Sequence, residues 1–287
     1  MIKNILFLLT LSCIALFSFA QLSPGAKSTG NFILGKIDTL HSDILSEKRV
    51  LNIYLPDGYS PDSATRYPVI YLLDGGARED FIHVTGLVRY FTTPWINQFP
   101  QSIVVGIENV NRRRDFTFAT SNLDFVTRMG FDKNTIGSHG GSAKFISFIE
   151  KELQPFIQAN YKTSLSKTII GESLGGLLAT EILLKQPSLF DTYIIIDPSL
   201  WWGAESLLKG PAAFSNQFKR KLKVYIGAAN KAESAVMYND ALNLAQQLKK
   251  YPGTITVHFD YMPKETHATA IHLGIYNAFR LLYPGGM

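Results

Sequence analysis

The sequence has 287 residues, of which 46% are hydrophobic and 18% are charged. This composition excludes a disordered chain, a collagen and a coiled coil, and the low share of charged residues indicates a large buried core. The formal net charge is +5, and because the basic residues are spread along the chain, the sequence predicts no nucleic-acid partner. One large domain fits the length better than two small ones.

The first twenty residues have the pattern of a secretory signal peptide. Lys3 supplies a positive charge, residues 5–19 are almost entirely apolar, and Ser18-Phe19-Ala20 places small residues before Gln21. The apolar stretch is too short for a membrane-spanning helix. We therefore expect residues 1–20 to be cleaved and the mature protein to be exported, to the periplasm or outside the cell, without stable insertion into a membrane.

Cleavage would also remove Cys13, the only cysteine. The exported chain would then have no disulfide, no cysteine nucleophile and no thiolate metal site, so its chemistry would depend on oxygen and nitrogen groups. Residues 21–31 are rich in Ser, Pro and Gly and are expected to form a linker. Residues 32–287 are expected to form one catalytic domain.

From residue 32 onward, apolar runs of strand length alternate with helical stretches. The pattern predicts strands at 32–38, 50–55, 69–73, 103–107, 168–171, 193–196, 222–227 and 255–261, and helices at 81–91, 142–160, 174–185, 232–250 and 268–282. From the third strand onward most positions are apolar, which is typical of parallel strands covered on both faces. The alternation predicts an α/β fold whose sheet has eight strands, mostly parallel and flanked by helices, as in an α/β-hydrolase.

The most informative motif is Gly171-Glu172-Ser173-Leu174-Gly175. A predicted strand leads into it and a predicted helix leads out of it, which is the arrangement that exposes a nucleophilic serine at the edge of a sheet. We expect side chains at Gly171 and Gly175 to collide with the neighbouring strand and helix. The N–H of Leu174 would point at a bound carbonyl oxygen from the positive end of the helix. The alternative is an ordinary strand-to-helix turn with a capping serine.

A serine hydroxyl needs a base to remove its proton, and in this fold that base is a histidine after the last strand. The chain has six histidines. His41, His83 and His139 precede the serine, His258 lies inside the last predicted strand, and His272 lies inside the last predicted helix. His267 stands in the loop between them and is the predicted base, the alternative being a capping or solvent-facing histidine.

The acid that orients the histidine is expected in a loop after the strand at 222–227. Glu233 lies there and is the leading candidate, although a carboxylate in the first turn of a helix is favoured in any protein. Asp197, after the preceding strand, and Asp240, further along the helix, are the alternatives. A serine–histidine dyad without an acid also stays open.

These segments, together with Tyr67 to Gly75, Pro198 to Trp202 and Glu265 to Ala268, resemble the putative-esterase family of α/β-hydrolases, which includes esterase D and enterobactin-type siderophore esterases. The similarity runs from about residue 32 to residue 283. The resemblance implies hydrolysis of a carboxylic ester through an acyl-enzyme, without cofactor or metal. It also implies that the backbone of Gly75 or Gly76 supplies the second oxyanion donor. Relatives often carry an Asp-Gly-Asp-Ala-His-like turn here, and this chain departs from it at Gly76 and Arg78.

Substrate contacts are expected from three regions. Arg112 and Arg114 follow the fourth predicted strand, where they would meet an anionic substrate such as a ferric catecholate, or else pair with Asp115 in a solvated loop. The long connection at 116–141 is typical of a functional cover. Trp201 and Trp202 would wall an acyl or aromatic pocket, unless one of them is plain core.

Three functions are consistent with these observations. The first is an exported serine esterase acting on a small-molecule or glycan-linked ester, such as a siderophore ester. The second is an acyltransferase that uses the same three residues and passes the acyl group to a sugar. The third is a binding protein built on a hydrolase scaffold. The sequence sets neither the ester nor the oligomeric state.

Overall fold

The computed structural model describes residues 30–209, 218 and 220–284. The predicted signal peptide, residues 1–20, lies outside the described residues, and the predicted linker at 21–31 is described only at residues 30 and 31. From Leu34 onward the described chain forms one compact unit. No helix in the described part combines the length and apolar character needed to cross a bilayer.

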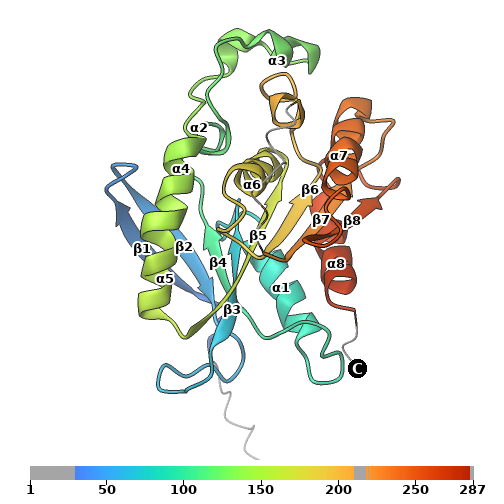
Figure 1. The fold of residues 1–287 in the computed structure, drawn as a ribbon. Helices are drawn as coiled ribbons and strands as arrows, with labels where there is room; N and C mark the ends of the chain where they lie inside the picture. The colour runs from blue at the N-terminus through green and yellow to red at the C-terminus, as the bar shows by residue number, and fades with distance from the viewer. Residues whose placement is uncertain (1–29, 210–217, 219, 285–287) are drawn as a thin grey trace, which may run out of the picture. The chain divides into compact units, whose positions relative to one another are not determined.

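The described residues form one eight-stranded sheet in the order β1-β2-β4-β3-β5-β6-β7-β8 (Figure 1). β1 pairs antiparallel with β2, and β2 pairs antiparallel with β4, whereas every other neighbouring pair is parallel. The predicted fold class, an α/β-hydrolase-like sheet that is mostly parallel, is confirmed. The strand bounds are β1 Lys36–Ser42, β2 Glu47–Tyr54, β3 Tyr67–Leu72, β4 Ile103–Ile107, β5 Thr163–Glu172, β6 Thr192–Ile196, β7 Leu222–Ala228 and β8 Ile255–Tyr261.

Helices cover both faces of the sheet. On one face α1 (Phe81–Phe91) and α8 (Ala270–Leu282) bury their apolar sides in one core cluster. On the other face a larger cluster joins α4 (Ser142–Phe148), α5 (Gln154–Asn160), α6 (Leu174–Lys185) and α7 (Ala235–Leu248). Because both faces are buried, the central strands β4 and β6 are apolar along almost their whole length.

The remaining elements are short. α2 (Arg112–Phe116), α3 (Asp124–Arg128) and the 3-10 turn η1 (Lys133–Thr135) lie within the long connection after β4, and a second 3-10 turn, η3, spans Ser206–Leu208. The helix predicted at 142–160 contains a π-helical segment, η2 (Ile149–Leu153), between α4 and α5. Pro155 follows that segment, and its missing N–H favours a change of hydrogen-bond pattern there.

Predicted bounds differ most at the first strand, which was expected at 32–38 and lies at Lys36–Ser42. Its position is decided by antiparallel pairing with β2, in register from Lys36 opposite Ile53 to Ser42 opposite Glu47. Strands β5 to β8 run parallel, so their carboxyl ends lie along the same side of the sheet. The loops that follow these strands are therefore brought together there.

Candidate active site

Ser173 lies at a strained turn between β5 and α6. Its backbone has a φ of 57°, in the left-handed region that non-glycine residues rarely adopt. The Ser173 N–H donates to the carbonyl of Ile196 at 3.0 Å, which ties the turn to β6. A Cβ at Gly171 would lie 2.4 Å from the backbone carbonyl of Gly175, so the expected collision is confirmed there. At Gly175 the predicted collision is wrong, because an added Cβ would meet its nearest neighbours, side-chain atoms of Leu73 and Asp74, at an ordinary contact distance of 3.4 Å.

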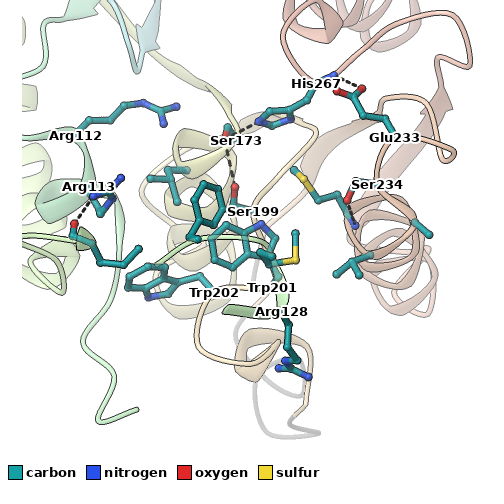
Figure 2. Close-up of a pocket in the computed structure, with 17 residues that line it drawn as sticks. Arg112, Arg113, Arg128, Ser173, Ser199, Trp201, Trp202, Glu233, Ser234 and His267 are labelled. Carbon is teal, nitrogen blue, oxygen red and sulfur yellow. Dashed lines mark hydrogen bonds between the residues drawn. The ribbon is translucent and has the colours of Figure 1, made fainter. Parts of the chain in front are cut away.

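His267 reaches the Ser173 hydroxyl, as predicted. It stands in the loop between β8 and α8, and its Nε2 lies 3.0 Å from Ser173 Oγ. Figure 2 shows this contact and a second one, in which Ser199 Oγ lies 3.2 Å from Ser173 Oγ. With the imidazole at hydrogen-bond distance, the pair can transfer the hydroxyl proton from oxygen to nitrogen.

The other ring nitrogen of His267 contacts Asp197 and not Glu233. Nδ1 lies 2.6 Å from Asp197 Oδ2, and the second carboxylate oxygen, Oδ1, accepts the N–H of Ala229 at 3.0 Å. Asp197 is buried, with a relative exposure of 3%. A carboxylate in this position holds the imidazole in the tautomer that leaves Nε2 free to accept a proton.

The prediction that Glu233 contacts the imidazole is therefore corrected. Its Oε2 accepts the backbone N–H of His267 at 2.8 Å, so Glu233 holds the loop and not the ring (Figure 2). The reason is the sheet register, which sets Ile196 opposite Glu172 and so brings residue 197 beside the serine turn. Asp240 lies on α7, and its charge interacts with Glu205 and Lys209 instead.

Electrostatics favour a protonated imidazole in this setting. The hydrogen bond that the ring donates to Asp197 raises the pKa of His267 most strongly, partial burial lowers it, and the negative charges of Glu172 and Glu233 raise it further. The pKa of the Glu172 carboxyl, beside the serine, is also shifted: burial raises it from 4.5 to about 7. The site therefore contains two groups, His267 and Glu172, whose pKa values are both raised by their surroundings.

Of the three predicted oxyanion donors, one is available. Leu174 is the first residue of α6, so its N–H has no acceptor within the helix, and the residue lines the pocket. The N–H of Gly75 donates to the carbonyl of Ile107 at 3.0 Å, and the N–H of Gly76 donates to Glu79 Oε2 at 2.7 Å. Both predicted second donors are thus already engaged, because the turn after β3 is bonded to β4 and to its own Glu79.

The hydroxyl opens into a cavity of about 630 Å³. The predicted residues Arg112, Trp201 and Trp202 line it, and Trp202 is fixed by a hydrogen bond from its indole N–H to the carbonyl of Phe118 at 2.9 Å. Four lining residues, Arg128, Met129, Phe131 and Ile136, come from the connection at 116–141 that was expected to contact substrate. The lining residues that sequence reasoning missed come from α2, from the loop after β6 and from the start of α7 with its cap: Arg113, Ser199, Ser234, Ala235, Val236 and Met237. No motif marks them, since they meet only in the folded chain.

The structure does not bring Arg114, a predicted substrate contact, to the cavity. Its guanidinium pairs with Glu47 at 2.6 Å and with the buried Asp115 at 2.7 Å. Arg112 lies on the other side of the short helix α2, where it makes two hydrogen bonds to Asp74, at 2.6 and 2.9 Å. Residues two apart on a helix point to nearly opposite sides, so Arg114 anchors α2 while Arg112 faces the cavity.

Within the described ranges, no group of three or more His, Cys, Asp or Glu side chains is placed to hold a metal ion. The chemistry that this site can carry out with its own residues is proton transfer and attack by the Ser173 oxygen.

Comparison with known proteins identifies the family of the chain. Residues 42–259 match the profile of the family described as "Putative esterase". The chain is 30% identical over 257 residues to the ferri-bacillibactin esterase BesA of Bacillus subtilis (strain 168), covering 84% of this chain and 88% of that relative.

The chain is also similar to solved structures. An IroE-like serine hydrolase from Shewanella oneidensis is 32% identical, with a TM-score of 0.74 over 87% of this chain and 80% of that one. The BES protein from Bacillus cereus is 24% identical and shares the fold, with a TM-score of 0.77 over 90% of this chain and 99% of that one. The chain belongs to the putative-esterase family of α/β-hydrolases.

Proposed function

We propose that the protein is a serine esterase in which Ser173 is the nucleophile, His267 the general base and Asp197 the acid that orients it. Family membership supports hydrolysis of ester bonds. The single observation that carries the serine mechanism is the continuous chain of hydrogen bonds from Asp197 to His267 to Ser173. This chain begins at the buried carboxylate of Asp197, directly after β6, and ends at the Ser173 hydroxyl, which lines the cavity.

The reaction follows from the order of these groups. His267 Nε2 takes the Ser173 proton as the oxygen attacks the ester carbonyl, and the imidazolium then gives that proton to the departing alcohol. The N–H of Leu174 stabilises the oxyanion; removal of one such donor typically costs about 3–4 kcal/mol of transition-state stabilisation. Water then repeats the sequence on the acyl-enzyme and releases the acid.

The residues that line the cavity suit an ester whose acyl part is aromatic and anionic. Three arginines, Arg112, Arg113 and Arg128, share the lining with Trp201 and Phe131, whose rings stack with centroids 5.7 Å apart. Flat aromatic walls beside cationic groups suit a catecholate-type acyl group. The names of relatives such as the ferri-bacillibactin esterase support a siderophore ester. The signal-peptide pattern in residues 1–20 supports export to the periplasm or the medium.

Labelling with a fluorophosphonate probe tests this proposal. The wild-type protein is expected to be labelled and to hydrolyse a catecholate siderophore ester faster than a short neutral aryl ester. Ser173→Ala should abolish both, whereas Ser234→Ala, which removes another serine hydroxyl that lines the cavity, should keep the labelling. An unlabelled wild-type protein would rule out the serine mechanism. Acyl transfer to an added sugar in preference to water would redefine the protein as an acyltransferase.

A further inference from the structure

One carboxylate beside the reacting groups has no part in the mechanism above. Glu172 is the last residue of β5, directly before Ser173, and its side chain is only 16% exposed. Its Oε1 lies 3.5 Å from His267 Nε2, the nitrogen that receives the serine proton. The imidazole of His267 therefore has a carboxylate at each of its two nitrogens, Asp197 at Nδ1 and Glu172 at Nε2.

Among the described residues, the only arginine or lysine that faces Glu172 makes its shorter contacts with another acid. Arg112 Nη2 donates to the Glu172 backbone carbonyl at 3.3 Å but stays 3.9 Å from the Glu172 carboxylate. The same guanidinium makes two shorter hydrogen bonds to Asp74, from the turn after β3. Glu172 thus remains a poorly compensated acid whose other near cation is the protonated form of His267.

The remaining charges around the imidazole are also negative. Asp197 comes from the end of β6, Asp74 from the end of β3, and Glu233 from the loop after β7. Burial, followed by the charges of Asp74 and Asp197, raises the pKa of Glu172, while His267 and Arg112 lower it, and the resulting value is about 7. Glu172 and His267 lie 3.5 Å apart and each shifts the pKa of the other, so their protons come off as a coupled pair.

We infer that Glu172 is a positioning residue whose carboxylate stabilises the imidazolium of His267 and so sets the basicity of the proposed base. This inference rests on the proposed esterase mechanism. When the serine proton moves to Nε2, the positive charge formed on the ring lies between two carboxylates. The proton then continues to the leaving alcohol as the C–O bond breaks, and Glu172 acts only through the charge it places beside the ring.

A purely structural role for Glu172 predicts something different. If its carboxylate served only to hold Arg112 and the helix α2, replacing it with an isosteric amide would leave the pKa of His267 unchanged. If the carboxylate stabilises the imidazolium, the amide must lower that pKa, because a negative charge near a cation has been removed. The pKa of His267 is therefore the quantity to measure.

The experiment is an NMR titration of the His267 ring protons in the full chain, assigned by their loss in His267→Gln. Glu172→Gln is expected to lower the midpoint by about one pH unit. The matched control is Glu79→Gln, which removes an acid that interacts with Arg112 but not with His267, and it should leave the midpoint where it is. An unchanged midpoint in Glu172→Gln would overturn the inference.

The wild-type protein provides a second measurement that needs no variant. Because Glu172 titrates beside the ring, the His267 curve should show two inflections, and a single inflection would contradict the coupling. In hydrolysis, Glu172→Gln should move the acidic limb of kcat/KM to lower pH and lower the plateau. If the wild-type protein shows no Ser173-dependent labelling, the proposed function fails while the titration can still stand. If labelling is present and the Glu172→Gln midpoint is unchanged, only this inference fails.

Discussion

The substitution Asp197→Asn isolates the role of the buried acid. Asp197 Oδ1 accepts the N–H of Ala229, and Oδ2 contacts His267 Nδ1. An asparagine would keep its oxygen toward the Ala229 N–H, which needs an acceptor, so its NH₂ group would face Nδ1 as a donor. The imidazole would then place its proton on Nε2 and could no longer accept the Ser173 proton.

The expected loss is large and specific to catalysis. A serine hydrolase whose histidine is held in the wrong tautomer loses about 10⁴-fold in kcat, a magnitude known from the corresponding change in a serine protease. It corresponds to about 5.5 kcal/mol of transition-state stabilisation. Residue 197 has a φ of 38°, and asparagine tolerates this region better than most residues, so the fold should be kept.

The assay is steady-state hydrolysis of an aryl ester, with unfolding curves to confirm equal stability. The matched control is Glu233→Gln, because glutamine keeps an oxygen that can accept the backbone N–H of His267. We expect less than about a tenfold loss in that variant. Near-normal turnover in Asp197→Asn, or an equal loss in Glu233→Gln, would refute the assignment of Asp197.

Three further predictions concern stability, binding and pH. Gly171→Ala should lower the free energy of unfolding by about 3 kcal/mol in denaturant titrations, because its Cβ would lie 2.4 Å from backbone atoms; Gly86→Ala, in an open position of α1, should raise it by up to about 1 kcal/mol. Arg114→Gln should cost about 1–3 kcal/mol of stability without changing KM, whereas Arg112→Gln should raise KM for an anionic ester more than for a neutral one. Glu172 has a pKa of about 7 in the folded chain against 4.5 without its surroundings, so its ionisation destabilises the fold as pH rises from 4.5 through 7. At about 1.4 kcal/mol per unit, the free energy of unfolding of Glu172→Gln minus that of the wild type should increase by about 3.5 kcal/mol from pH 4 to pH 8. A difference that does not change with pH would contradict this.

Local patterns predicted most of the fold because both faces of the sheet are buried. Strands β4 and β8 and helices α1 and α6 have the predicted bounds, since each is a continuous apolar run or an amphipathic stretch with clear ends. Short elements such as α2 and α3 escaped prediction. Five residues carry too little periodicity to distinguish a helical turn from a loop.

Some features of the site could also be predicted from local sequence. The turn that exposes Ser173 depends on a strand, a glycine and a helix that are adjacent in the chain, so its geometry could be predicted from residues 168–185. The position of His267 followed from chain order, because the loop after the last strand of such a sheet lies at the same edge. The Ser173 turn and the position of His267 therefore follow from the order of strands and helices along the chain.

Only the tertiary structure decided which acid meets the ring, which arginine faces the cavity and which N–H groups are free. Asp197 is chosen over Glu233 by the register between β5 and β6, and Arg114 is removed from the cavity by its pairing with Asp115. The N–H groups of Gly75 and Gly76 are engaged by a neighbouring strand and by Glu79. Each of these outcomes depends on contacts between residues distant in the chain or on the direction of a side chain, and no local pattern encodes either.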